Sequence, residues 1–167
     1  MKRRLIILGV VAAVVLYCDQ MTKALSGIHL QGRPPVVMID GIFNLVYVEN
    51  TGAAFGLFAG AKEGLRLPIF HIVSAIAIGA IFFLFFTLKE HQILLTVSLS
   101  AILGGALGNF ADRVRLGHVV DFLDFHWGDL HWPAFNVADI AITIGVGLLI
   151  LDMILGKEED SSSLSPE

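Results

Sequence analysis

Four long apolar stretches dominate this sequence of 167 residues. They cover residues 5–25, 68–88, 92–111 and 137–155, and each is close to the ~20 residues that a helix needs to cross a ~30 Å hydrocarbon layer. In lipid, every backbone N–H and C=O must be bonded within the protein, so isolated stretches of this kind fold as helices. The sequence therefore predicts an all-α membrane protein with four transmembrane helices.

Composition agrees with a membrane protein, since 56% of the residues are hydrophobic and only 16% are charged. A net charge of -4 offers no basic stripe for a phosphate backbone, so no nucleic-acid partner is expected. Cys18 is the single cysteine, which excludes intrachain disulfides and a metal site built from cysteines.

The first apolar stretch follows Lys2, Arg3 and Arg4, as in a cleavable signal peptide. No small-x-small cleavage site follows it, and bulky Tyr17 stands before Cys18, where a lipoprotein-type site needs a small residue. We therefore expect this helix to be retained. The basic trio places the N-terminus in the cytoplasm, although other basic residues flank the opposite ends of the spans. With four spans, both termini are then cytoplasmic.

Residues 29–67 and 112–136 are then extracytoplasmic. Within the first segment, β-branched and aromatic runs at 36–39 and 42–48 flank Asp40-Gly41, which predicts a β-hairpin and a small outer sheet. Residues 59–67 have mixed polarity and are expected to lie along the membrane interface as an amphipathic helix.

One domain is expected over residues 1–156. The remaining segment, residues 157–167, is rich in acidic residues and serine and predicts a disordered cytoplasmic tail.

Ionisable and amide side chains are costly in hydrocarbon, so those near a span need a partner, water or a function. Most of them gather at the predicted outer ends of the spans, and two more aspartates lie in an apolar run between the third and fourth spans. These residues are Asp19, Gln20, Lys23, Asn109, Asp112, Arg113, Asp121, Asp124, Asn136 and Asp139.

Asp121 and Asp139 are expected on the same side of the membrane, although spacing alone does not bring them together. Two carboxylates that meet in a partly dry cleft cannot both ionise cheaply, so they share one proton. One can then activate water while the other protonates the carbonyl and the leaving amine. This chemistry hydrolyses an amide without a nucleophile, metal or cofactor, and it predicts an aspartic peptidase.

Structural roles compete with this interpretation. Asn136 and Asp139 fit a helix N-cap with an acid in the first turn, and Asp19 and Lys23 fit an i,i+4 salt bridge; spacing alone favours both structural roles. Asp112 beside Arg113 fits interfacial snorkelling equally well.

Two further patterns do not indicate a catalytic site. Gly104-x-x-x-Gly108 favours close helix packing. His118, His126, Asp129 and His131 share an outer segment but match no compact metal motif, so no metal is expected.

A small transporter or proton relay is the competing function, and a non-catalytic scaffold is a third. A relay requires charged residues along the full depth of the membrane. The second span offers only His71 near its outer end, and Asp152 lies near the cytoplasmic end of the fourth.

The polar residues fall into five motifs whose sequences and order resemble the bacterial lipoprotein signal peptidase family, also called signal peptidase II. The resemblance spans residues 5–155. The motifs are DQMTK at 19–23, NTGAAFG at 50–56, GNFADR at 108–113, VVDF at 119–122 and FNVAD at 135–139.

This resemblance implies an enzyme of the bacterial cytoplasmic (inner) membrane, with its active site near the extracytoplasmic face and no cofactor. Its partners would be membrane lipids and a prolipoprotein with a diacylglyceryl cysteine, cut just before that cysteine. Asp121 and Asp139 would be the catalytic pair. The supporting or substrate-binding residues would be Asp19, Lys23, Asn50, Gly52, Asn109, Arg113 and Asn136.

Overall fold

The structure, a computed structural model, describes residues 1–52 and 63–162. Its helices and strands follow the order α1 (Lys2–Leu30), β1 (Val36–Ile39), β2 (Phe43–Asn50), α2 (Glu63–Thr87), α3 (Ile93–Leu116), β3 (Val119–Trp127), β4 (Leu130–His131) and α4 (Val137–Ser162). Within the described residues, four helices are long and apolar enough to cross a membrane. The prediction of four spans with a small sheet is therefore confirmed.

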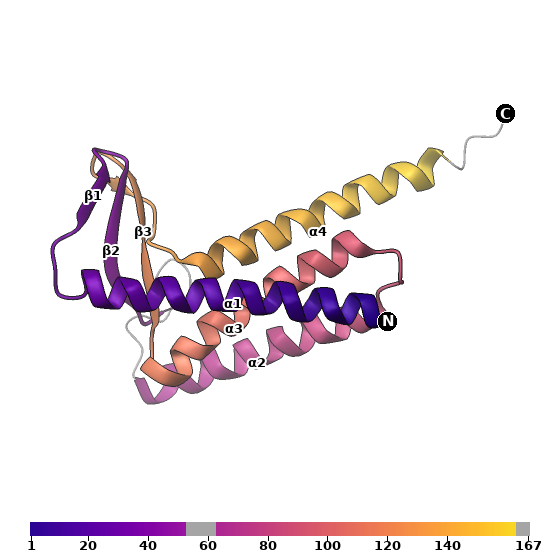
Figure 1. Cartoon of the computed structure of the whole chain (residues 1–167), viewed down its shortest axis with the longest axis horizontal. Helices are drawn as coiled ribbons and strands as arrows, with labels where there is room; N and C mark the ends of the chain where they lie inside the picture. The colour runs from indigo at the N-terminus through magenta and orange to yellow at the C-terminus, as the bar shows by residue number, and fades with distance from the viewer. Residues whose placement is uncertain (53–62, 163–167) are drawn as a thin grey trace.

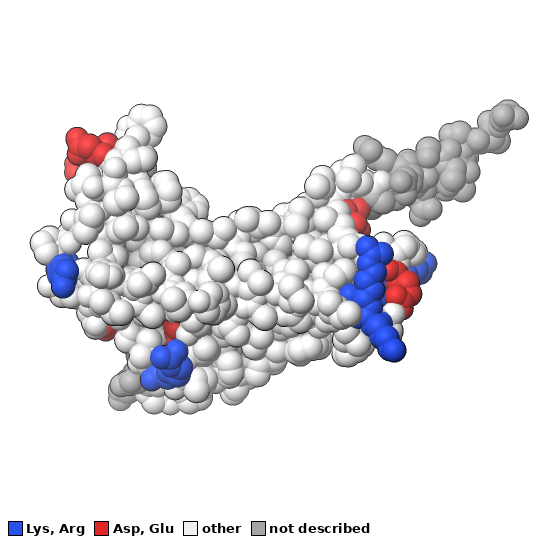
Figure 2. Space-filling view, viewed as in Figure 1, with Lys and Arg blue, Asp and Glu red and all other residues white. Residues whose placement is uncertain are grey.

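The helix α3 packs against each of the other three helices. Successive helices run in opposite directions, so the start of α1 and the end of α4 lie at one end of the bundle and the sheet lies at the other (Figure 1). Figure 2 shows charged side chains gathered over the two ends of this face, with an uncharged band between them. Exposed side chains in the middle of the helices, such as Val14, Ile76 and Ile144, are apolar, as hydrocarbon requires.

Close packing around α3 depends on glycine. A Cβ added to Gly104 would lie 2.7 Å from Val15 Cβ and 2.8 Å from the Ala12 carbonyl, and one added to Gly108 would collide with the Asp19 carboxylate. The prediction that Gly104 and Gly108 allow close helix packing is thus confirmed. The same contacts hold α1 against the half of α3 that is nearer the sheet.

Two helices extend beyond their apolar stretches. The predicted spans end at residues 25 and 111, whereas α1 continues to Leu30 and α3 to Leu116. Asp112 and Arg113 therefore lie in the last turns of α3. The reason is that a polar side chain ends an apolar stretch but not a helix when it finds a partner. The helix α3 ends instead at Gly117, whose positive φ of 79° suits glycine and whose N–H bonds to the Arg113 carbonyl at 3.2 Å.

The predicted cytoplasmic tail is helical at its start. The helix α4 continues to Ser162, so it includes residues 157–162 of that segment, and residues 163–167 lie outside the described part. Residues 63–67 of the predicted interfacial helix form the beginning of α2, and residues 59–62 lie outside the description.

The four strands form one antiparallel sheet in the order β1-β2-β3-β4. The predicted hairpin is confirmed, with Gly41 in the turn at a φ of 70°. The strand β3 was not predicted; it pairs with β2 from Phe43 opposite Phe125 to Asn50 opposite Val119. This pairing joins the segment between α1 and α2 to the segment between α3 and α4, and it brings Asn50 to the start of β3.

Candidate active site

Asp121 lies on β3 and is almost completely buried. Its Oδ1 accepts a hydrogen bond from Asn136 Nδ2 at 2.6 Å, and its Oδ2 accepts one from Asn50 Nδ2 at 2.9 Å. Burial raises the pKa of Asp121 to about 6, and the nearby charge of Asp139 adds to this, while the two amide hydrogen bonds oppose it. Asp121 therefore holds its proton at higher pH than an ordinary aspartate.

Asp139 lies in the first turn of α4, where it and Asn136 cap the helix reciprocally. The Asp139 N–H donates to Asn136 Oδ1 at 3.0 Å, and the Asn136 N–H donates to Asp139 Oδ2 at 3.3 Å. The structural interpretation of this pair is therefore correct. It does not exclude the catalytic one, because the Nδ2 of the same Asn136 bonds to Asp121.

Asn109 on α3 links Asp139 to α1. Its Nδ2 donates to Asp139 Oδ1 at 2.8 Å, and its Oδ1 accepts from Lys23 Nζ at 2.9 Å and from Asn136 Nδ2 at 3.2 Å. Two donors at the amide oxygen fix the orientation of the side chain. The amide nitrogen must then face Asp139.

Lys23 is the centre of a buried ion cluster. Its Nζ lies 2.9 Å from Asp19 Oδ2 and 2.9 Å from Asp112 Oδ2. The predicted Asp19–Lys23 salt bridge is confirmed, whereas Asp112 is buried and does not snorkel. Asp19 also accepts from the Ala138 N–H at 2.9 Å, and Asp112 accepts from the Val120 N–H at 3.2 Å. The cluster thus holds the chain next to Asp139 and Asp121.

Asn50 and Arg113 complete the predicted set. The Gly52 N–H donates to Asn50 Oδ1 at 3.0 Å, which leaves the amide nitrogen of Asn50 facing Asp121. Arg113 donates to the Asn109 carbonyl at 3.3 Å, and its guanidinium carbon lies 5.1 Å from the centre of the Phe70 ring. All the predicted site residues therefore lie in one connected region.

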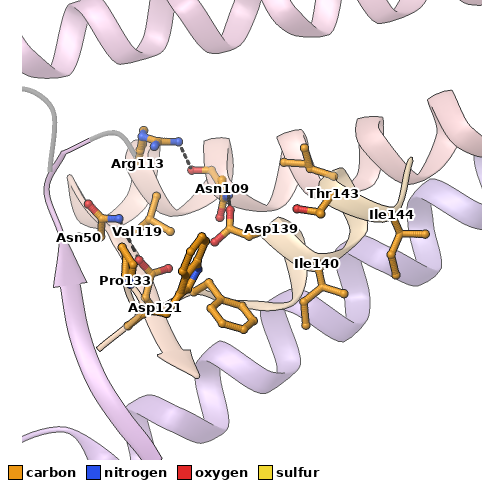
Figure 3. Close-up of a pocket in the computed structure, with 14 residues that line it drawn as sticks. Asn50, Asn109, Arg113, Val119, Asp121, Pro133, Asp139, Ile140, Thr143 and Ile144 are labelled. Carbon is orange, nitrogen blue, oxygen red and sulfur yellow. Dashed lines mark hydrogen bonds between the residues drawn. The ribbon is translucent and has the colours of Figure 1, made fainter. Parts of the chain in front are cut away.

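A cavity of about 510 Å³ lies between α3, α4 and the end of the sheet, and both candidate carboxylates line it (Figure 3). Its wall also includes apolar and polar residues that the sequence analysis did not single out. The lining consists of Asn50, Asn109, Arg113, Val119, Asp121, Trp132, Pro133, Ala134, Phe135, Asp139, Ile140, Ile142, Thr143 and Ile144.

Thr143 and residues 132–134 are the lining positions of most interest among those missed. Thr143 follows Asp139 by four residues, so the helical period alone would have placed it on the same face. Residues 132–134 gave no comparable signal, because they reach the cavity through a bridge between the next residue, Phe135, and Leu123 of the unpredicted strand β3.

This arrangement suits acid–base hydrolysis. Two carboxylates line one cavity, and burial raises the pKa of Asp121 above that of an ordinary aspartate. The described lining residues include no serine or cysteine, and their one aliphatic hydroxyl, that of Thr143, has no hydrogen bond to a base that could activate it as a nucleophile. The fold and the site together define a membrane-embedded peptidase of the aspartic class.

Comparison with known proteins agrees with that class. The sequence model of the family described as "Signal peptidase (SPase) II" matches residues 11–155. A lipoprotein signal peptidase of Syntrophus aciditrophicus is 44% identical over 96% of this chain and 100% of its own length. One from Geobacter metallireducens is 45% identical over 96% and 98%.

A solved structure described as a bacterial membrane enzyme at 2.3 Å resolution has the same fold, with a TM-score of 0.79 and 31% identity over 96% of this chain and 92% of its own. The chain belongs to the signal peptidase II family, whose members are aspartic peptidases that remove signal peptides from prolipoproteins.

The pKa of Asp121 leads to a prediction about pH. If Asp121 supplies the proton for catalysis, kcat/KM should fall above about pH 6, by up to tenfold per pH unit, as that proton is lost. In Asn50→Ala, the loss of a hydrogen bond to the ionised form should move this decline to higher pH. Cleavage rates measured from pH 4 to 9 test both points. An unchanged alkaline limb in Asn50→Ala would contradict the role of Asp121 as the acid.

Proposed function

We propose that Asp121 and Asp139 are the catalytic pair and that the substrate is a prolipoprotein whose cysteine carries diacylglycerol. Asp139 removes a proton from a water molecule while Asp121 gives its proton to the carbonyl oxygen of the cleaved bond. In the second step, the proton on Asp139 passes to the leaving amine as the C–N bond breaks, and Asp121 takes back a proton from one hydroxyl group of the intermediate as the new C=O forms. The observation that carries this proposal is that both carboxylates line one cavity.

The remaining polar residues divide into two roles. Asn50, Asn109 and Asn136 orient the carboxylates through the hydrogen bonds described above. Asp19 and Lys23 support this arrangement from α1, and Gly52 fixes Asn50. Arg113 lines the cavity with most of its N–H donors uncommitted among the described residues, so it is suited to bind substrate carbonyl groups.

The cavity wall on α4 supports a substrate that carries lipid. Ile140 and Ile144 line the cavity, and their side chains are 37% and 56% exposed on a helix that crosses the membrane. The cavity therefore adjoins the hydrocarbon layer along α4. Acyl chains attached to a substrate cysteine can stay in the bilayer while the peptide reaches the carboxylates.

We place the site near the extracytoplasmic face of the bacterial inner membrane, with both termini in the cytoplasm. Lys2 and Arg3 lie at the end of the bundle far from the sheet, and positive charge favours the cytoplasmic side. Residues 1–156 then form the peptidase domain, and residues 157–167 form a cytoplasmic extension. The sheet and the cavity lie at the opposite end, where a translocated signal peptide ends.

A cleavage assay tests the substrate. Purified protein in detergent should cut a lipobox peptide with a diacylglyceryl cysteine on the N-terminal side of that cysteine, as read by mass spectrometry. The same peptide with an unmodified cysteine should be cut at least about a hundredfold more slowly. Equal cleavage of both peptides would contradict the lipid requirement, and no cleavage of either would favour the transporter or relay.

A further inference from the structure

Hydrogen-bonding capacity is unevenly distributed among the side chains of the cavity. The amides of Asn50 and Asn109 have both their oxygen and their nitrogen engaged. Arg113 retains free N–H groups among the described residues, but a guanidinium offers only donors. Apart from the two carboxylates, two side chains among the described lining residues can still accept a hydrogen bond. Asn50 Oδ1 already accepts from the Gly52 N–H and has one acceptor position left, whereas the Thr143 hydroxyl has no hydrogen bond at all within the described residues.

The Thr143 hydroxyl differs from most other hydroxyls on the helices. Those of Thr22, Thr87, Thr96, Ser98 and Ser100 each donate to a carbonyl three or four residues earlier. This local bond is the usual way for a hydroxyl to be satisfied in a membrane helix. In the described part of the chain, Thr143 has no such bond and no other hydrogen-bond partner, although its neighbours on the cavity wall are Ile142 and Ile144. Thr143 is exposed, so its hydroxyl is free to bond to a molecule that enters the cavity.

The position of Thr143 relative to Asp139 suggests what binds it. Four residues of α-helix place Thr143 about 6 Å further into the membrane than Asp139, and Figure 3 shows the two residues on the cavity wall formed by α4. An extended peptide advances about 3.3 Å per residue. Thr143 is therefore about two residues from the cleaved bond, on the side where the signal peptide continues into the bilayer.

We propose that the Thr143 hydroxyl binds the substrate by accepting a hydrogen bond from a main-chain N–H of the signal peptide, about two residues before the cleaved bond. This inference rests on the proposed function and extends it to one subsite. Arg113 has only donors for substrate carbonyls, so an N–H of an extended peptide needs an acceptor. Thr143 supplies it, and an N–H that reaches this apolar wall does not remain unpaired.

Kinetics of Thr143→Val provide the test, since valine keeps the shape and removes the hydroxyl. With the diacylglyceryl lipobox peptide, Thr143→Val should raise KM about tenfold, the usual contribution of one hydrogen bond, while kcat changes less than about twofold. Thr143→Ser should recover most of the loss. Thr87→Val is the matched control: its hydroxyl bonds to the Leu84 carbonyl at 2.7 Å far from the cavity, so KM should not change.

Modified substrates identify the bonded group. In three peptides, one of the amide N–H groups before the cleaved bond is replaced in turn by an ester oxygen. For the peptide that lacks the N–H to which Thr143 bonds, wild type and Thr143→Val should have equal KM values, because neither can form that hydrogen bond. A tenfold difference in KM between wild type and Thr143→Val that persists for all three ester peptides would overturn the proposal. The proposal would also be overturned if the difference in KM disappeared only with a peptide whose lipid esters are replaced by an ether-linked dialkylglyceryl group, since Thr143 would then bind the lipid. Asp139→Asn should cut none of the peptides; if it does cut them, the catalytic pair is wrong whatever Thr143 does.

Discussion

Asp139→Asn and Asp121→Asn are each expected to lower the cleavage rate by at least about a thousandfold, because an amide can neither take a proton from water nor give one to the leaving group. The substitution at Asp139 is mild for the fold. Its side-chain oxygen can still accept from the Asn136 N–H or from Asn109. The diacylglyceryl peptide assay measures the rate, and thermal unfolding in detergent verifies that each variant is folded.

Asp124→Asn is the matched control on the same strand. Asp124 lies three residues after Asp121, so its side chain points to the other face of β3 and does not line the cavity. Its carboxylate contacts His131 Nδ1 at 2.8 Å and Asn44 Nδ2 at 3.2 Å. Activity within a few-fold of wild type is expected. An inactive Asp124→Asn together with an active Asp121→Asn would reverse the assignment of the pair.

Lys23→Met should cause the second large effect, a loss of about 3–5 kcal/mol in the free energy of unfolding. It removes the cation that lies 2.9 Å from both Asp19 and Asp112, and two buried carboxylates then remain without it. A fall in Tm in detergent measures this loss. Adding Asp112→Asn to Lys23→Met should restore part of the stability, because one unpaired charge is removed.

Lys89→Met is the control for Lys23→Met, since Lys89 is exposed in the turn between α2 and α3. It should leave Tm unchanged, as expected for a surface charge without a buried partner. A Tm of Lys23→Met equal to that of wild type would show that the ion cluster does not stabilise the fold.

The spans and the hairpin could be predicted from sequence because each depends on a local pattern. Twenty apolar residues define a membrane helix, and Asp40-Gly41 between two β-branched runs defines a turn. Helix ends were less predictable. Asp112 ended the third apolar stretch, yet the helix continues past it, because Lys23 from a distant part of the chain neutralises its charge.

The strand β3 and the cavity could not be predicted for a related reason. Val119, Val120 and Asp121 are all buried, so the alternation of apolar and polar residues that indicates a half-exposed strand is absent. The motifs listed the candidate residues, and spacing indicated the local bond between Asn136 and Asp139, but the bond from Asn136 to Asp121 depends on the tertiary contact between β3 and the start of α4. Spacing along the chain does not encode such contacts.

Asn136 both caps α4 and bonds to Asp121, so the formation of the last helix and the assembly of the candidate site depend on the same side chain. Its side chain begins α4 and holds Asp121, and Asp139 closes the same helical turn. If Asp121 and Asp139 are the catalytic pair, a chain in which that turn is still unwound holds its acid and its base on separate segments. We therefore expect peptidase activity to arise only after the last helix has docked.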